Sequence, residues 1–239
     1  MGWIVGVDGC RTGWMTVWRE TRHPAQRFPA RFEIFPTLAE LARALPDLDA
    51  LAIDMPIGLP TRIDGSGRPP EKAVRPMLGA RQSSVFSIPA RAAVEAEDYA
   101  EACRQALAAS NPPRKVAKQG FNLFPKIREL DLFLRDRPAL VDRVVETHPE
   151  LVFRRLKGEP LAHPKKTAEG RAERLALLAG AGLPPELLAA SPPPGAGADD
   201  LLDAAACLLT AERHARGEAI PHPATVTRDS HGLRMAIWA

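Results

Sequence analysis

The sequence has few of the residues that build disulfide and zinc frameworks. It contains 3 cysteines, widely spaced at Cys10, Cys103 and Cys207, and no Cys-x-x-Cys pair. An odd number at this spacing argues against a disulfide framework and against a structural zinc site. Tyr99 is the single tyrosine, and no aromatic motif of an RNA-recognition module is present.

Long apolar runs and a strong charge imbalance are also missing. No run is long enough to cross a bilayer, and the N-terminus lacks the pattern of a signal peptide. We therefore expect a cytoplasmic protein that does not enter a membrane. The net charge of +3 is too small to indicate nucleic-acid binding by itself. Residues 60–91 carry a local net charge of +4, which fits either a substrate-facing edge or a solvated loop.

The sequence does contain alternating apolar strand and helix patterns. With 239 residues, 45% of them hydrophobic, it predicts a single domain over residues 1–239. The first part predicts three strands, a helix and a fourth strand. Their expected ranges are 2–8, 14–19, 31–35, 37–45 and 51–54.

The middle of the chain interrupts this rhythm. Residues 61–140 begin rich in proline, arginine and glycine and then become helical, which indicates an insertion or lid. The helices expected within it cover 92–109 and 125–135. After it we expect a strand at 143–146, helices at 149–156, 167–179 and 199–216, and a C-terminal β-hairpin at 225–238.

Two expected core strands end in an aspartate. Asp8 follows one apolar run and Asp54 follows another. Taken singly, each is explained as a turn or strand-end residue. Together they suggest a site, because carboxylate oxygens are the hard ligands that Mg²⁺ and Mn²⁺ prefer. Two such ions can activate water and stabilise the leaving oxygen of a phosphodiester. We therefore expect Mg²⁺ or Mn²⁺ as cofactor.

Another acidic pair opens the helix expected at 199–216. Asp200 and Asp203 are three residues apart and share a helix face that continues through small residues. Such a face allows the helix to pack closely on a sheet. Both acids could serve only as caps and partners of the helix dipole, as Asp199 is expected to do. The alternative is that both join Asp8 and Asp54 as metal ligands and catalytic residues, and this is the hypothesis we adopt.

The strand expected at 143–146 ends in a further acid. Glu146 is a candidate catalytic residue in the sequence Glu-Thr-His-Pro-Glu, and Glu150 could take its place. His148 could be a ligand or could position water, although a single histidine is more often structural. The sequence leaves the choice among these three open.

Basic residues near these acids are candidate ligands for a phosphate-containing substrate. Arginine can bind phosphate in a bidentate manner and lysine as a point charge. The candidates are Arg11 beside Asp8, Lys165 and Lys166 after the sequence His-Pro, and Arg75, Arg81 and Arg91 in the insertion. Ser83 and Ser84 are not expected to be nucleophiles, because no Gly-x-Ser-x-Gly elbow surrounds them.

Six stretches together resemble domain-of-unknown-function family 429, a bacterial and archaeal family described as predicted nucleases with an RNase H-like fold. The stretches are GVDGCRTGW (6–14), AIDMPIGLP (52–60), ARQSSVFSIPAR (80–91), ETHPELVF (146–153), HPKKTAEGRAERLALL (163–178) and DDLLDAAACLLTA (199–211). The resemblance implies an α/β fold with three antiparallel strands followed by parallel ones, flanked by helices. It places Asp8 on the first strand, Asp54 on the fourth, and Asp200 and Asp203 on the final helix.

The leading functional hypothesis is a nuclease, a hydrolase that cleaves phosphodiester bonds through a carboxylate-bound two-metal site and has nucleic acid as its partner. A second hypothesis is a nucleotide-binding enzyme like actin-type ATPases or sugar kinases, because GVDGCRTGW resembles their phosphate loop. The chain is short for their two lobes, and a second Gly-rich loop is missing. A third hypothesis is a non-catalytic module that binds nucleic acid or protein. Fold alone does not decide among them.

Overall fold

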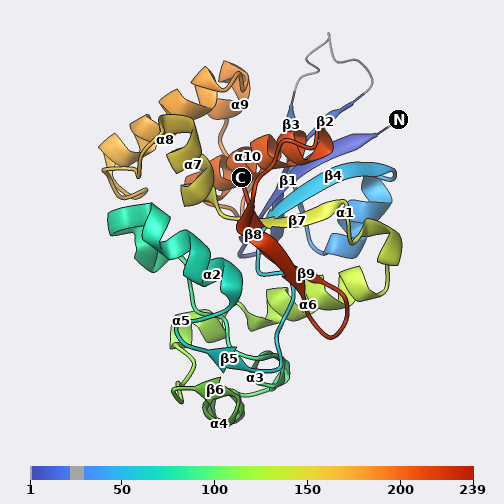
Figure 1. Cartoon of the computed structure of the whole chain (residues 1–239). Coiled ribbons are helices and arrows are strands. Elements are labelled where there is room, and N and C mark those ends of the chain that lie inside the picture. The colour runs from blue at the N-terminus through green and yellow to red at the C-terminus, as the bar shows by residue number, and fades with distance from the viewer. Residues whose placement is uncertain (1, 22–29) are drawn as a thin grey trace.

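The computed structural model describes residues 2–21 and 30–239 and is centred on a mixed sheet of seven strands (Figure 1). In order across the sheet the strands are β3 (Arg31–Phe35), β2 (Gly13–Glu20), β1 (Trp3–Cys10), β4 (Leu48–Asp54), β7 (Val144–Thr147), β9 (Arg234–Trp238) and β8 (Pro221–Arg228). The pairs β1–β2, β2–β3 and β8–β9 are antiparallel, whereas β1–β4, β4–β7 and β7–β9 are parallel. The prediction of a mixed α/β sheet flanked by helices is confirmed.

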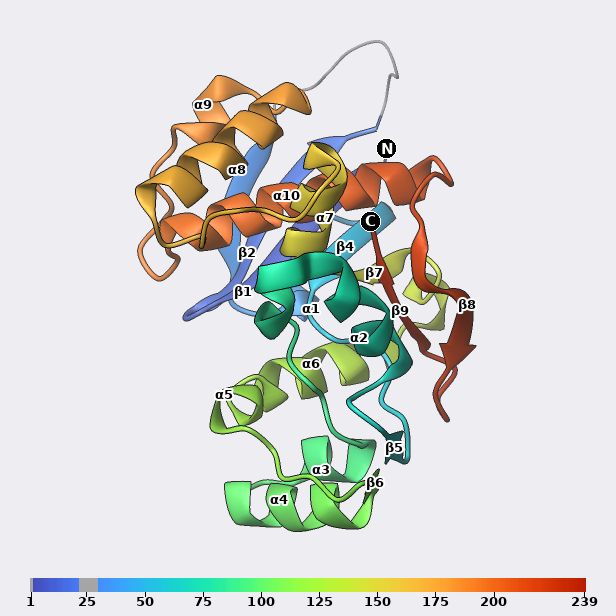
Figure 2. The same ribbon diagram turned by 60° about the vertical axis from the view of Figure 1, so that its left-hand side comes forward.

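Helices cover both faces of this sheet (Figures 1 and 2). On one face lies α10 (Ala198–Ala215), with α7 (Pro149–Lys157), α8 (Ala168–Gly180) and α9 (Pro185–Leu188) beside it. On the other face lie α1 (Leu38–Ala44) and α6 (Phe124–Arg135). In the part of the chain that the structure describes, no helix combines the length and the apolar character needed to cross a membrane.

The face under α10 depends on small residues. A methyl group at Gly6 of β1 would overlap the carbonyl oxygen of Ala204 and the amide nitrogen of Leu208 on α10. Ala204, Cys207 and Ala211 are completely buried on the same helix. The predicted small-residue stripe is therefore present, and it lets the helix backbone lie directly on β1.

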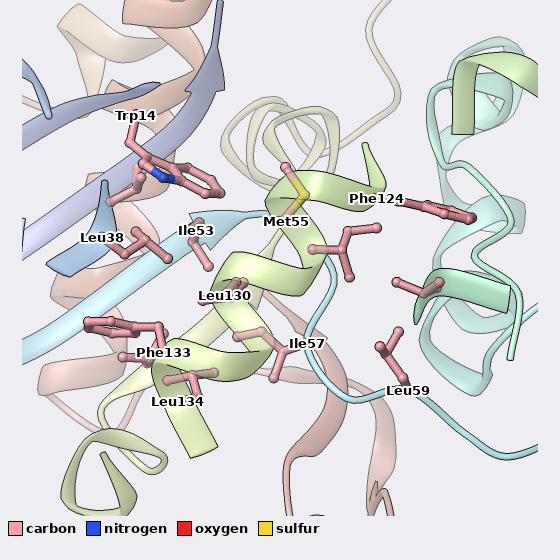
Figure 3. Packing of buried hydrophobic residues seen from close by; sticks show 14 of the residues in the cluster. Trp14, Leu38, Ile53, Met55, Ile57, Leu59, Phe124, Leu130, Phe133 and Leu134 are labelled. Atoms are coloured by element: carbon pink, nitrogen blue, oxygen red, sulfur yellow. The ribbon is translucent and has the colours of Figure 1, made fainter. Parts of the chain in front are cut away.

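The opposite face carries the larger hydrophobic cluster. Ile53 of β4 and the chain that follows it, including Met55 and Ile57, pack against α6 through residues such as Leu130 and Phe133 (Figure 3). This packing fixes the path of the chain as it leaves Asp54. The strand tip that carries the predicted acid is thereby held in place by buried apolar contacts.

Residues 61–140 lie between β4 and β7 and project below the main sheet in Figure 2. They contain a small parallel pair of strands, β5 (Ile63–Asp64) and β6 (Ser110–Asn111). Their helices are α2 (Pro69–Val74), the 3₁₀ helix η1 (Arg75–Ser84), α3 (Arg91–Glu95), α4 (Tyr99–Ala108), α5 (Lys118–Phe121), α6 and the 3₁₀ helix η2 (Pro138–Leu140). The stretch predicted to be helical around 92–109 forms two helices, because extended Ala96 ends α3 and the Asp98 side chain caps α4 by accepting from the Glu101 amide at 2.8 Å.

The C-terminal hairpin joins the main sheet. It was expected at 225–238 and forms β8 and β9, with β8 beginning earlier, at Pro221. β9 pairs in parallel with β7, so Glu146 lies opposite Ile237 and Thr147 opposite Trp238. The hairpin therefore covers the edge of β7 that β4 leaves free.

Candidate functional site

Asp8 and Asp54 lie side by side at the tips of the parallel strands β1 and β4. They are direct register partners. Successive side chains of a strand point to opposite faces, so Asp8 lies on the same face as Gly6, and Asp54 on the same face as Ala52. Gly6 touches α10, and Ala52 packs with Cys207 of α10. Both acids therefore belong to the face of the sheet that α10 covers.

Asp203 adds a third carboxylate from the first turns of α10. Its side chain is buried, and its Oδ2 accepts a hydrogen bond from Lys165 Nζ at 2.7 Å. The close approach of α10 to Gly6 brings this acid to the strand tips. The structure thus assembles Asp8, Asp54 and Asp203 as the sequence predicts.

The proximity of these acids is visible in their electrostatics. Burial, and then the negative charges of Asp54, Asp203 and Asp200, raise the pKa of Asp8 well above its usual value. Burial raises the pKa of Asp54 to about 7, although Lys165 opposes the shift. Burial also raises the pKa of Asp203 to about 6 against the same opposition from Lys165. The cluster therefore holds its negative charge poorly unless a cation neutralises it.

Lys165 is the cation whose charge opposes the raised pKa values of Asp8, Asp54 and Asp203. Burial by itself would lower the pKa of Lys165, but the Asp203 carboxylate outweighs that effect and holds it above the usual value. The Lys165 side chain is 41% exposed, whereas that of Asp203 is 6% exposed. The ion pair therefore joins a buried carboxylate to a partly exposed ammonium group.

Asp200 has a different local role. It lies in the first turn of α10, where its Oδ2 accepts a hydrogen bond from the Gly197 amide at 2.8 Å and caps the helix. Its charge still contributes to the raised pKa of Asp8. Asp200 is thus close to the cluster, but one of its oxygens is engaged by the helix end.

Glu146 lies at the end of β7, where both of its oxygens accept hydrogen bonds. Arg68 donates to them at 2.7 and 3.2 Å, and the Ile57 amide donates at 2.8 Å. Burial raises the pKa of Glu146 to about 6, and Arg68 opposes that shift. Arg68 also binds Glu71 at 2.8 Å and is itself buried. Sequence reasoning missed Arg68, because its partner lies 78 residues further along the chain.

Glu150 and His148 present unsatisfied atoms near the same place. Glu150 Oε1 accepts a hydrogen bond from Arg174 at 2.5 Å, and His148 Nε2 lies 3.3 Å from the Ser84 carbonyl oxygen. Glu150 Oε2 and His148 Nδ1 are buried without a hydrogen-bond partner among the residues that the structure describes. Burial lowers the pKa of His148, which keeps the imidazole neutral at pH 7.

Two adjoining cavities open around these side chains. The first, of about 230 Å³, is lined by Asp8, Asp54 and Glu146 together with apolar residues, and we call it the carboxylate pocket. The second, of about 440 Å³, is lined by Asp203 and Lys165 among others, and we call it the lysine pocket. Both cavities are lined by Asp54, Ser84, Phe86 and His148.

The predicted basic residues divide into two groups. Arg81, Lys165 and Lys166 line the lysine pocket. Arg75 and Arg91 do not line either pocket but are held in the fold. Arg75 donates to the Val85 and Ser66 carbonyl oxygens and to Ser87 Oγ, and Arg91 forms ion pairs of 2.8 Å with Asp131 and Asp229. Arg11 is exposed in the turn between β1 and β2.

Lys126 is a further side chain that sequence reasoning missed. It lines the carboxylate pocket from α6, donates to the Gly13 carbonyl oxygen at 2.5 Å and lies 4.2 Å from the centre of the Trp14 ring. Burial lowers the pKa of Lys126, while Cys10, Glu129 and Asp8 oppose that shift. No local motif marks this residue, because its neighbours come from the first hairpin.

Across residues 2–21 and 30–239, no three side chains of His, Cys, Asp or Glu already surround one point as metal ligands.

In comparisons with known proteins, a family model described as "Protein of unknown function (DUF429)" matches residues 6–228. No curated protein and no solved structure matches the chain.

Proposed function

The chain belongs to the DUF429 family of proteins of unknown function, and we propose that it is a metal-dependent nuclease. One observation carries the proposal. Asp8, Asp54 and Asp203 come from two adjacent strand tips and one facing helix, and each has a raised pKa because burial and neighbouring charge disfavour its ionised form. A cluster kept at such a cost in stability is typical of a functional site.

The donor atoms around this cluster suit Mg²⁺ or Mn²⁺. Carboxylate oxygens are the preferred ligands of both ions. Glu150 Oε2 and His148 Nδ1 are unpartnered within the described residues, and both residues line the same cavity as Asp54 and Asp203. Lys165 now supplies the positive charge, and its partial exposure gives the ammonium group room to move toward water. We therefore assign Asp8, Asp54 and Asp203 as the residues that would hold the ions, with Asp200 next to them.

In the proposed hydrolysis, different residues of the chain would have different roles. The bound metal would activate water and stabilise the leaving oxygen of a phosphodiester. Arg81, Lys165 and Lys166 would hold the phosphate in the lysine pocket by charge. Neutral His148, which lines both pockets, would accept on its unpartnered Nδ1 the proton that the attacking water loses. Glu146 would act through the loop that it binds at Ile57, keeping the chain after Asp54 in position.

The strand order supports an RNase H-like assignment of the fold. β1, β2 and β3 are sequential and antiparallel, and β4 and β7 extend the sheet in parallel on the other side of β1. In such an arrangement the acids on the first and fourth strands meet an acid on the final helix. Asp8, Asp54 and Asp203 occupy these three elements.

The direct experiment measures cleavage of a labelled oligonucleotide with Mn²⁺. We expect Asp8→Asn and Asp54→Asn to abolish cleavage while retaining the circular dichroism spectrum of the folded protein. Asp64→Asn is the matched control, because the Asp64 side chain is 72% exposed. Full cleavage by either folded site variant would show that these acids do not hold the reacting centre.

A further inference from the structure

Phe86 is an exposed aromatic residue at the meeting point of three cavities. It follows η1, and its side chain is 38% exposed. It lines the carboxylate pocket, the lysine pocket and a third cavity of about 260 Å³. We call the third one the insertion pocket, since residues 63–120 line it. A large apolar side chain kept partly in water at such a junction is available to a ligand.

The charges around this junction follow a pattern. Arg81, Lys165 and Lys166 line the lysine pocket at one end. Arg114 and Lys115, both exposed, line the insertion pocket at the other end. Asp54 and Asp203 line the lysine pocket, Asp8 and Asp54 line the carboxylate pocket, and Phe86 lines all three cavities. A path with cations at both ends and an aromatic ring beside the reacting groups matches a chain of phosphates with bases attached.

The first cavity gives the path an apolar wall. Met55, Val85 and Leu123 line the carboxylate pocket together with the aspartates. A base turned into this pocket would contact apolar side chains, while its phosphate stayed at the carboxylate side. The pocket has about 230 Å³, which leaves room for a single unpaired base rather than for a duplex.

We propose that the substrate is single-stranded nucleic acid, laid from the lysine pocket across Phe86 into the insertion pocket. This inference rests on the proposed nuclease function and names its substrate class. Phe86 would stack on one base, which an unpaired strand can offer and a duplex cannot without unpairing. Arg114 and Lys115 would bind phosphates on the far side of the aspartates.

Binding to the wild-type protein without divalent metal separates this inference from catalysis. The ligands are fluorescent single strands of DNA and RNA of about 12 nucleotides, a length within the site sizes of single-strand binders. The same sequence as a duplex and a mononucleotide complete the set. We expect at least one of the two single strands to bind at least about tenfold more tightly than the duplex and the mononucleotide. Only a single strand can stack a base on Phe86 and also make several phosphate contacts. The single strand that binds more tightly shows whether the protein prefers DNA or RNA.

Variants test the path residue by residue. Phe86→Ala should weaken single-strand binding about five- to a hundredfold, the loss expected for one base–aromatic stack, and Phe86→Trp should retain it. Leu132→Ala is the control, because Leu132 on α6 is a 54% exposed apolar residue that lines none of the three cavities. Removing Arg114 and Lys115 together should lower the slope of log Kd against log salt by about 1.4.

Equal affinity for the duplex, or unchanged binding by Phe86→Ala, would overturn the single-strand path. Tighter binding of the mononucleotide would also overturn it and would restrict the ligand to the carboxylate pocket. If the single strand binds as expected but Mn²⁺ produces no cleavage, the path is supported and the nuclease proposal fails. If Mn²⁺ produces cleavage of the duplex and Phe86→Ala cleaves normally, the nuclease proposal stands and the path fails.

Discussion

Replacing Asp54 by asparagine should stabilise the metal-free protein at pH 8. Burial raises the pKa of Asp54 to about 7, so the folded protein binds its proton more tightly than the unfolded chain does. Ionising Asp54 at higher pH therefore costs folding free energy. Asparagine keeps the size of the side chain and removes this cost, along with one of the charges that raise the pKa of Asp8.

The size of the expected stability gain follows from the pKa shift of Asp54. In the unfolded chain an aspartate has a pKa of roughly 3.9, and each unit of difference corresponds to about 1.4 kcal/mol. The gap of about three units gives roughly 4 kcal/mol, which we reduce to about 2 to 4 kcal/mol because Asp54 opens onto two cavities that admit water.

The direction of the Asp54 pKa shift determines how the stability difference between the variant and the wild type depends on pH. Below about pH 4 the carboxyl is protonated in both states, so the variant gains nothing. Between about pH 4 and pH 7 the unfolded chain ionises first, and the advantage of Asp54→Asn grows. Above pH 7 it is constant. Urea denaturation in EDTA at pH 4 to 8 measures this difference, with Asp64→Asn expected to stay within about 0.5 kcal/mol of the wild type. A loss of stability in Asp54→Asn, or a gain that does not vary with pH, would refute the electrostatic account.

Further predictions concern the supports of the site. Gly6→Ala should lower the free energy of unfolding by about 1 to 3 kcal/mol, seen in urea denaturation, and weaken Mn²⁺ binding by calorimetry, because the new methyl group pushes α10 off β1. Arg68→Ala should cost about 3 to 5 kcal/mol by the same denaturation assay, since Glu71 and Glu146 lose their buried partner. Arg81→Ala should weaken oligonucleotide binding at low salt and less at high salt, and unchanged affinity at low salt would place Arg81 outside the path.

The sequence was sufficient to predict where the central acids lie. Asp8 and Asp54 each end an apolar run, and a strand tip is a local property that such runs report. The small residues before and after Cys207 likewise indicate a helix packed on a sheet. These predictions succeed because periodicity and residue size act within a few residues, and the structure brings Asp8, Asp54 and Asp203 together accordingly.

The basic side chains were less predictable. Arg75 and Arg91 looked like Arg81 in sequence, but their partners are fixed by tertiary contacts, as when Arg91 meets Asp229 from the far end of the chain. Arg68 belongs to none of the quoted stretches, and Phe86 lies in the stretch 80–91 without any local sign that its ring faces a cavity. Charge density along a sequence cannot distinguish a guanidinium group that faces a cavity from one that is held by distant carboxylates, because both kinds occur within the same stretch, residues 60–91.

The most direct test of the central claim is Mn²⁺-dependent hydrolysis of a labelled single-stranded oligonucleotide by the wild type and by Asp54→Asn. We predict cleavage by the wild type that EDTA abolishes, and no cleavage by the variant, although the variant remains folded and is more stable without metal. Cleavage that continues in EDTA, or that Asp54→Asn retains in full, would contradict the assignment of a metal-dependent site at the tips of β1 and β4.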